Sequence, residues 1–333
     1  MRIGKLLVGA GAALMALSTT VSTTLPSTAH AQDDDFDIVL VPGLTTDAFY
    51  ITMNKGAQAA AEALGVNVDF QGAEDFNPTL QIPVLEAVIA RQPDAIVIAP
   101  TDTTQLIEPL RRAVDNGIAV VTVDTFIDDG KYQDGSGDGD FPMSYIASDN
   151  VAGGRMAAAA MAEAMGGEGS VYVSNVRPGI STTDQREEGF KAEMTENHPG
   201  ITVLDTQYNE NDASTAASQL QAVLARQPDL GGVFGANLFS ALGAANGVES
   251  ADKSGDITVV AFDAPQSIVE QLESDLVDMA IAQHPAEIGY YGVVTAHAHL
   301  TGQSVPPLVG TGFTVITKDN VEDEDVARFI YSD

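Results

Sequence analysis

The sequence has 333 residues and a formal net charge of −32, with 47 acidic against 15 basic side chains and no cysteine. This charge disfavours nucleic acid and anionic membranes as partners. The lack of cysteine excludes disulfides, cysteine-linked lipid anchors and thiol catalysis. Because 44% of the residues are hydrophobic and regularly spaced, we interpret the acidic residues as a charged surface adapted to high salt rather than as disorder.

The amino-terminal stretch has the pattern of a secretory signal peptide. Arg2 and Lys5 form a basic start, residues 6–17 are mostly apolar, and residues 29–31 form a small-x-small cleavage motif. We expect cleavage after Ala31 and export of a soluble protein to the periplasm, since no stretch approaches the roughly 18 apolar residues of a membrane span. The 13 basic and 47 acidic residues that remain give a net charge of −34. A mature chain of about 300 residues favours two domains.

The first predicted unit is a strand, a turn and a helix. Residues 38–41 are a short apolar run before Pro42-Gly43, which is typical of a buried parallel strand. Small and apolar residues then recur in steps of three and four over residues 48–64, which predicts a helix closed by Gly65. Ligands of open α/β sheets bind at the carboxyl ends of the strands. We therefore expect a ligand to meet the fold at Thr45, Thr46, Asp47, Phe49 and Tyr50, although N-capping by Asp47 and packing of the aromatic pair alone would explain those three residues.

Three further strands and two helices are predicted before residue 124. The strands are 66–70, 95–99 and 119–123, and the helices begin at Asn77-Pro78 and at residue 104. Pro83 predicts a kink or a delayed start in the first of these helices, and Gly117 ends the second, at residue 116. Strands that alternate with helices in this way indicate βαβ units and a parallel sheet. The fourth strand ends at Asp124, again at the carboxyl edge.

Residues 128–140 form a loop rich in Gly and Asp. Asp134, Asp138 and Asp140 alternate as calcium ligands do, but the spacing lacks the EF-hand register and its final Glu. We favour a solvated acidic loop and leave calcium binding open.

The alternation of strands and helices resumes after this loop. Strands are predicted at 145–147, 170–174, 202–205 and 233–235, and helices at 150–165, 182–197 and 213–226. The pentapeptide ARQPD occurs at residues 90–94 and again at 225–229, each time between a helix and a buried strand. Two related α/β lobes would place such a repeat in this way.

The last predicted pieces are strands at 257–262 and 277–282 and a helix at 286–300. Polar residues follow several of the apolar runs, and the fold itself needs none of them there. They are Asp124, Asn237, Asp263 and Gln283.

Several kinds of chemistry lack support in the sequence. There is no phosphate-binding GxxxxGK[ST] loop and no GxSxG elbow. His297 and His299 would point about 200° apart on a helix, so they cannot chelate one metal ion. We expect no metal and no cofactor. The carboxylates, amides, single Arg and aromatic side chains that remain are typical of sugar recognition, because they bond to hydroxyl groups and cover the apolar face of a ring.

The ordered segments resemble a known family: FYITMNKGAQAAAEALG, DAIVIAPTD, VVTVDT, YIASDNVAGG, REEGFKAEM, VFGANLFSALGA, VVAFDAP and AIAQHPAEIGYYG. Nearly the whole mature chain is similar to the periplasmic sugar-binding proteins of ABC transporters of the ribose/galactose type. The resemblance implies an α/β fold with two Rossmann-like lobes, whose parallel sheets are joined by a hinge of three crossovers. After the signal peptide at 1–31, it places lobe 1 at 33–147 plus 284–311 and lobe 2 at 148–283 plus 312–333.

The resemblance also implies a ligand site. The contacts of lobe 1 fall on Asp47, Phe49, Tyr50 and Asp124, and those of lobe 2 and the hinge on Arg186, Asn237, Asp263 and Gln283. Three positions depart from the ribose binders. Thr125 and Asp184 stand where Arg is expected, and an aromatic residue is absent near Asn211. These changes remove two donors and a stacking face, which implies another pentose, a hexose or a polyol.

The implied function is capture of a monosaccharide or polyol between two closing lobes and its delivery to an ABC permease, with no reaction. We expect a monomer and no nucleic-acid partner. Two alternatives remain open at this point: a chemoreceptor-coupled binder of a sugar-like signal, and an exported carbohydrate-active enzyme.

Overall fold

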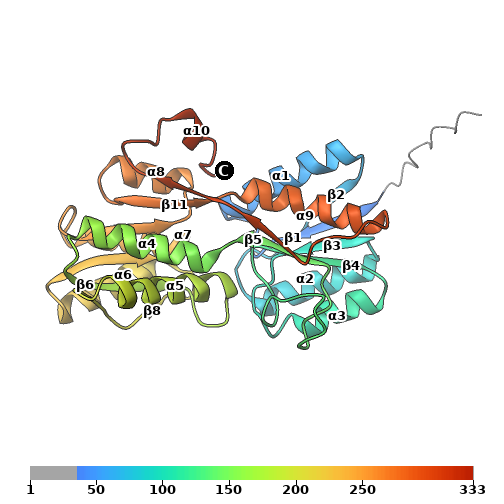
Figure 1. The fold of residues 1–333 in the computed structure, drawn as a ribbon, viewed down its shortest axis with the longest axis horizontal. Helices are drawn as coiled ribbons and strands as arrows, with labels where there is room; N and C mark the ends of the chain where they lie inside the picture. The colour runs from blue at the N-terminus through green and yellow to red at the C-terminus, as the bar shows by residue number, and fades with distance from the viewer. Residues whose placement is uncertain (1–35, 333) are drawn as a thin grey trace, which may run out of the picture. The chain divides into compact units, whose positions relative to one another are not determined.

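The computed structural model describes residues 36–332, so the predicted signal peptide and its cleavage site lie outside the described residues. The described residues belong to one structural unit that contains two β-sheets, each covered by helices on both faces (Figure 1). The elements alternate along the chain as the sequence predicts, because buried apolar strands and amphipathic helices follow one another.

The first sheet is entirely parallel. Its spatial order is β12 (Leu308–Thr311), β5 (Ser144–Ser148), β4 (Ala119–Val123), β3 (Ala95–Ile98), β1 (Asp37–Val41) and β2 (Asn67–Phe70). Alternate residues of the strands enter two separate cores. One core lies under α1 (Ala48–Leu64) and α9 (Pro285–Leu300), and the other lies under α2 (Pro78–Arg91) and α3 (Ile107–Asp115).

The second sheet repeats this plan with one change. Its order is β13 (Phe313–Ile316), β11 (Met279–Gln283), β10 (Thr258–Phe262), β9 (Leu230–Gly235), β6 (Gly169–Asn175) and β7 (Ile201–Val203), with the short β8 (Gln207–Tyr208) beside β6. Only β13 runs antiparallel to its neighbour among these described strands. Helices α4 (Asn150–Ala164) and α5 (Ser181–Asn197) cover one face, and α6 (Ala213–Arg226), α7 (Leu238–Ser250) and α8 (Gln266–Glu273) cover the other.

The chain passes from one sheet to the other three times. It crosses after β5, after β11, and between β12 and β13, where a single residue separates the two strands (Figure 1). After β13 the chain forms the short helix α10 (Glu324–Ala327) and ends near α1. The three-crossover arrangement predicted from the resemblance is therefore confirmed.

Helices α1 and α9 pack closely because glycines face each other's backbone. A Cβ at Gly289 would lie 2.0 Å from the Met53 carbonyl oxygen, and one at Gly56 would lie 1.9 Å from that of Ala286. The side chain of Asp47 accepts a hydrogen bond from the Phe49 N–H and caps α1, as predicted. This packing holds the start of α1, and so the turn after β1, in a fixed position.

One predicted helix start is confirmed and another is wrong. Helix α2 begins at Pro78 with Asn77 as its N-cap, as predicted, and it continues through Pro83 without a delayed start. A proline this early removes only one backbone hydrogen bond, and the Asn77 side chain caps the helix. Helix α3 begins at Ile107 rather than at residue 104, because the Asp102 carboxylate binds the N–H groups of the preceding turn.

Several elements are not predicted, namely α7, α8, α10, β8, β12 and β13. Helix α7 contains Gly243 and Gly247, which lower its intrinsic helix propensity. In the structure these glycines let α7 approach α6, since a Cβ at Gly243 would lie 2.4 Å from the Ala213 carbonyl oxygen. Tertiary packing thus stabilises a helix that local propensity disfavours.

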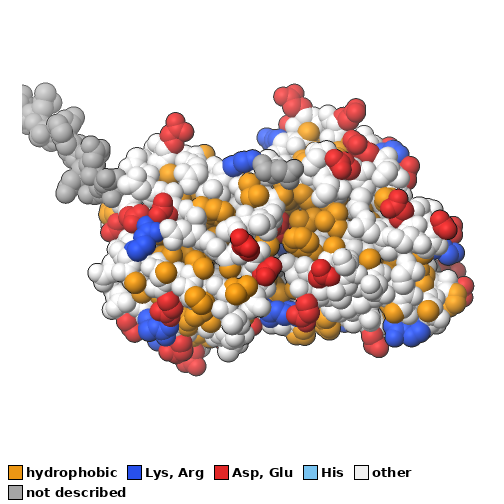
Figure 2. Space-filling model, turned by 180° about the vertical axis from the view of Figure 1, so that it is seen from behind, with side chains coloured by type: hydrophobic (Ala, Val, Ile, Leu, Met, Phe, Trp, Pro, Cys, Tyr) orange, Lys and Arg blue, Asp and Glu red, His pale blue; other side chains and the backbone are white. Residues whose placement is uncertain are grey.

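The acidic loop is held by its own hydrogen bonds. The carboxylate of Asp140 accepts from the N–H groups of Asp134 and Gly135, and that of Asp128 accepts from Gly139. No group of three or more metal-ligating side chains is placed to hold an ion within residues 36–332. On the face shown in Figure 2, acidic side chains lie at many places over the surface, some in small groups and some beside Lys or Arg.

Candidate functional site

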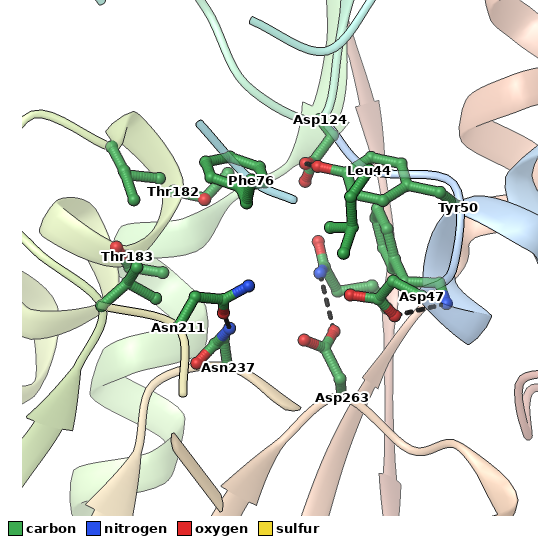
Figure 3. Close-up of a pocket in the computed structure, with 14 residues that line it drawn as sticks. Leu44, Asp47, Tyr50, Phe76, Asp124, Thr182, Thr183, Asn211, Asn237 and Asp263 are labelled. Atoms are coloured by element: carbon green, nitrogen blue, oxygen red, sulfur yellow. Dashed lines mark hydrogen bonds between the residues drawn. The ribbon is translucent and has the colours of Figure 1, made fainter. Parts of the chain in front are cut away.

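A pocket with a cavity volume of about 40 Å³ lies at the carboxyl ends of strands from both sheets (Figure 3). The lining residues are Leu44, Asp47, Phe49, Tyr50, Phe76, Asp124, Val176, Ile180, Thr182, Thr183, Asn211, Asn237, Asp263 and Gln283. All of the predicted site residues are among them except Thr45, Thr46, Thr125, Asp184 and Arg186.

Asp124 and Asp263 occupy equivalent places, at the ends of β4 and β10. Each backbone N–H donates to a carbonyl of the neighbouring strand, and each residue has a positive φ, of 61° and 78°. Asp tolerates this left-handed conformation better than most residues, but it remains strained. The turn directs both carboxylates into the space between the sheets, as Figure 3 shows.

The Asp124 carboxylate is held from the wall of the pocket. The hydroxyl of Tyr50 donates to its Oδ2 at 2.7 Å. Burial raises the pKa of Asp124 to about 6, while the Arg186 charge and the Tyr50 hydrogen bond act in the opposite direction. Asp124 therefore carries a proton more readily than an exposed aspartate.

Asp47 is the third carboxylate of the pocket. It is 8% exposed, and Figure 3 shows it among the residues that line the pocket with Asp263. Burial and the negative charge of Asp263 raise the pKa of Asp47 to about 7, against the lowering effect of the Phe49 N–H. At neutral pH this side chain is thus both a donor and an acceptor of hydrogen bonds.

The Asp263 carboxylate is held by one residue that lines the pocket and one that lies behind it. Its Oδ1 accepts from the Gln283 side-chain amide and from the hydroxyl of Tyr331, each at 3.0 Å. Its Oδ2 lies 4.0 Å from Nη1 of Arg186. Tyr331 was not predicted as a site residue, because no local pattern links it to Asp263.

Arg186 lies behind the pocket wall rather than in it. It is 2% exposed, and it donates to the Asn150 side chain and to the Ala236 carbonyl at 2.8 and 2.9 Å. Its Cζ lies 3.8 Å from the centre of the Phe262 ring. These contacts fix a buried positive charge beside the carboxylates, which compensates part of their repulsion.

The second sheet also contributes a wall of amides and hydroxyls. The Asn237 side chain donates to Asn211 at 2.7 Å, and both side chains line the pocket (Figure 3). Thr183 Oγ1 and Gln283 Oε1 are buried without a hydrogen-bond partner. Buried polar atoms are normally paired, so these two atoms are available to a bound molecule.

Four apolar residues that the sequence did not indicate complete the pocket: Leu44, Phe76, Val176 and Ile180. The wall around Phe76 depends on Gly43, where a Cβ would lie 2.4 Å from the Phe76 ring and 2.5 Å from the Tyr50 hydroxyl. These residues follow β1, β2 and β6, so only their position at the carboxyl edge of the sheets could have indicated them. Thr182 and Thr183 lie within one turn of the predicted Asp184 and were also missed.

Thr125 and Asp184 do not line the pocket. Thr125 is 1% exposed and lies directly behind Asp124, with an unpaired hydroxyl. The Asp184 carboxylate, in the first turn of α5, accepts from the Gly179 N–H at 2.8 Å. Burial raises the pKa of Asp184.

Hydrogen bonds between loops of the two sheets close one side of the pocket. Arg177 donates to the Thr101 carbonyl at 2.9 Å and lies 3.5 Å from the Asp102 carboxylate. The Phe126 N–H donates to the Ser181 hydroxyl at 3.1 Å. Asp47, Asp124 and Asp263 are each at least 92% buried in this arrangement.

The arrangement suits a small polar molecule with many hydroxyl groups. Carboxylates, amides and hydroxyls surround the centre, and aromatic rings supply apolar faces. No helix within the described residues is long and apolar enough to cross a membrane.

Comparison with known proteins identifies the family. Residues 38–304 match the sequence model of the periplasmic binding protein domain. The chain belongs to this family. Both the predicted resemblance and the predicted fold class are therefore confirmed.

The similar proteins cover nearly the whole chain. A ribose import binding protein, RbsB, from Haemophilus influenzae is 29% identical over 92% of this chain and 99% of its own. A crystal structure of an ABC transporter solute binding protein from Agrobacterium vitis, bound with alpha-D-tagatopyranose, is 70% identical, with a TM-score of 0.89, over 90% of this chain and 100% of its own. One from Agrobacterium radiobacter, in complex with D-arabinose, is 29% identical, with a TM-score of 0.82, over 89% and 99%.

Proposed function

We propose that this protein captures a ketohexose in its pyranose form, of the D-tagatose type, and delivers it to an ABC permease. The observation that carries the proposal is the 70% identity to the Agrobacterium vitis protein bound with alpha-D-tagatopyranose. The match extends over nine-tenths of this chain, and the pocket described above offers the chemistry that such a sugar needs.

The charges in the pocket favour a neutral polyhydroxy ligand. Tyr50, Tyr331 and the Gln283 amide already donate to the carboxylates of Asp124 and Asp263. With its pKa near 7, Asp47 is partly protonated at neutral pH. The remaining oxygens accept hydrogen bonds from sugar hydroxyls without requiring a cation.

Capture follows from the burial of the pocket. We propose that residues 33–147 plus 284–311 and residues 148–283 plus 312–333 act as two lobes. They separate to admit the sugar and close on it about the three crossovers. Closure removes water from both sets of carboxylates at once, which strengthens their hydrogen bonds to the sugar. We also propose export to the periplasm with cleavage after Ala31, in accord with the family.

A thermal-unfolding screen tests the ligand class. Wild-type protein is heated with D-tagatose, other ketohexoses, aldohexoses, pentoses and polyols. We expect D-tagatose to raise the melting temperature most, because a ligand that binds only the folded state stabilises it. If no sugar or polyol raises the melting temperature, the proposal is wrong.

The proposal includes no chemical step. Sugar recovered from the saturated protein by denaturation should give the NMR spectrum of the sugar that was added, after hours of incubation. Appearance of a new product would instead favour an enzyme that uses Asp47 and Asp124 as acid and base.

A further inference from the structure

Tyr331 is buried behind the pocket and contacts three of its lining residues. It is 2% exposed, although it lies in the irregular segment that follows α10. Its hydroxyl donates to Asp263 Oδ1 at 3.0 Å and accepts from the Gln283 N–H at 2.8 Å. Its ring meets the Phe49 ring edge-on, with centroids 5.7 Å apart and an interplanar angle of 65°.

The backbone around Tyr331 fixes it to both sides of the site. Its N–H donates to the Ala264 carbonyl at 2.9 Å, directly after Asp263 in the chain. The next residue, Ser332, accepts from and donates to the Thr52 side chain on α1. The segment therefore connects the strand end that bears Asp263 with the helix that bears Phe49.

These contacts assign the two oxygens of Asp263 to different partners. Tyr331 and the Gln283 amide both donate to Oδ1, so Oδ2 is the oxygen left for another donor. Asp263 also has a positive φ, so its backbone gives the side chain an unusual direction. A carboxylate that rotated freely would lose this assignment.

We infer that Tyr331 is a positioning residue for sugar recognition, because it orients the Asp263 carboxylate and so selects the sugar hydroxyl that Oδ2 accepts. This inference rests on the proposed function. Tyr331 does not line the pocket, so it acts through the lining residues that it contacts, of which Asp263 is the charged one.

The chain contains a matched control for a purely structural role. Tyr172 on β6 is also fully buried and belongs to the same hydrophobic core cluster as Tyr331. Its hydroxyl has no hydrogen-bond partner, and it does not line the pocket. Both Tyr331→Phe and Tyr172→Phe therefore remove a buried hydroxyl. Only Tyr331→Phe also removes a hydrogen bond to Asp263.

Calorimetric titration with D-tagatose tests the inference. Loss of a hydrogen bond to a charged group should weaken binding about tenfold in Tyr331→Phe. Tyr172→Phe should bind within about twofold of the wild type. D-Tagatoses that each lack one hydroxyl supply a second readout. One of these hydroxyls should be the one whose removal costs the least affinity in Asp263→Asn. Removal of that same hydroxyl should also cost much less affinity in Tyr331→Phe than in the wild type. An unchanged affinity and an unchanged deoxy pattern in Tyr331→Phe would overturn the inference.

A ligand-free measurement separates this inference from the proposed function. If wild-type protein binds no ketohexose, the proposed function fails, and the contact is tested through a double-mutant cycle on urea unfolding. Tyr331→Phe should then destabilise the wild type clearly more than it destabilises Asp263→Ala, since the second background lacks the acceptor. Equal effects in the two backgrounds would show that Tyr331 does not act through Asp263.

Discussion

Asp124 and Asp263 end equivalent strands of two similar sheets, yet they are held in different ways. Asp124 has one side-chain donor, Tyr50, which itself lines the pocket. Asp263 has two side-chain donors and a guanidinium at 4.0 Å. Asp263 therefore has more partners in place before a ligand arrives than Asp124 has, and one of them, Tyr331, does not line the pocket.

This difference assigns separate tasks to the two halves. A preorganised group gains affinity because its ordering is already complete in the free protein. The Asp263 half thus supplies most of the orientation of the sugar. The Asp124 and Asp47 half, with pKa values of about 6 and 7, is the part that responds to pH.

The largest effect should come from Asp263. We expect Asp263→Ala to abolish detectable D-tagatose binding in calorimetry under conditions where the variant is folded. Asp124→Asn keeps an oxygen for Tyr50, so it should weaken binding only about tenfold. A loss at Asp124 equal to or larger than that at Asp263 would refute the proposed division of tasks.

Removal of the buried Arg186 guanidinium should have the second largest effect, which is a loss of free energy of unfolding. In Arg186→Met the Asp263 charge is left without its nearest cation, which should lower the free energy of unfolding by about 3–5 kcal/mol in urea titration. Arg155 on α4 is the control, because its ion pairs with Glu193 and Glu196 are partly exposed. Arg155→Met should cost less than about 1 kcal/mol. Similar losses in both variants would show that Arg186 compensates no buried charge.

The stability of the ligand-free protein should depend on the protonation of Asp47. Its pKa in the folded protein is raised, so the protonated form is favoured on folding. This contribution to stability is fully present below the ordinary aspartate pKa of about 4 and is lost as the pH rises through about 7.

Asp47→Asn tests this dependence, since Asn also caps a helix. At pH 8 the variant should unfold at a higher temperature than the wild type, by the equivalent of about 1–2 kcal/mol. Near pH 4 the two should agree. Parallel curves of melting temperature against pH would contradict the raised pKa.

The smallest effect is expected at the loops that close the pocket. Arg177→Ala removes the contacts to Thr101 and Asp102 without touching a lining residue, so it should speed sugar release about threefold in stopped-flow measurements. Arg226→Ala, at the exposed end of α6, is the control and should leave the release rate unchanged. Slower release in Arg177→Ala would mean that these contacts do not restrain opening.

Local patterns in the sequence predicted the elements that do not depend on distant contacts. The bounds of α1 and α6 agree with the prediction to the residue, because caps and apolar periodicity determine both ends. The two copies of ARQPD end α2 and α6 and precede β3 and β9. Helix α7 was missed because its glycines stabilise it only through contact with α6.

The same limit applies to the site. The ends of parallel strands meet at one edge, so Asp124 and Asp263 could be found from the sequence alone. The role of Arg186 came from the resemblance, but its burial behind the wall depends on Asn150, Ala236 and Phe262. Tyr331 is 68 residues from Asp263, and no local pattern encodes such a contact.

A crystal structure of the protein grown with D-tagatose would test the central claim most directly. Our account predicts electron density for one pyranose ring between Asp124 and Asp263, with Oδ2 of Asp263 accepting a hydrogen bond from a sugar hydroxyl. A sugar bound elsewhere, or a pocket that stays empty at saturating D-tagatose, would contradict it.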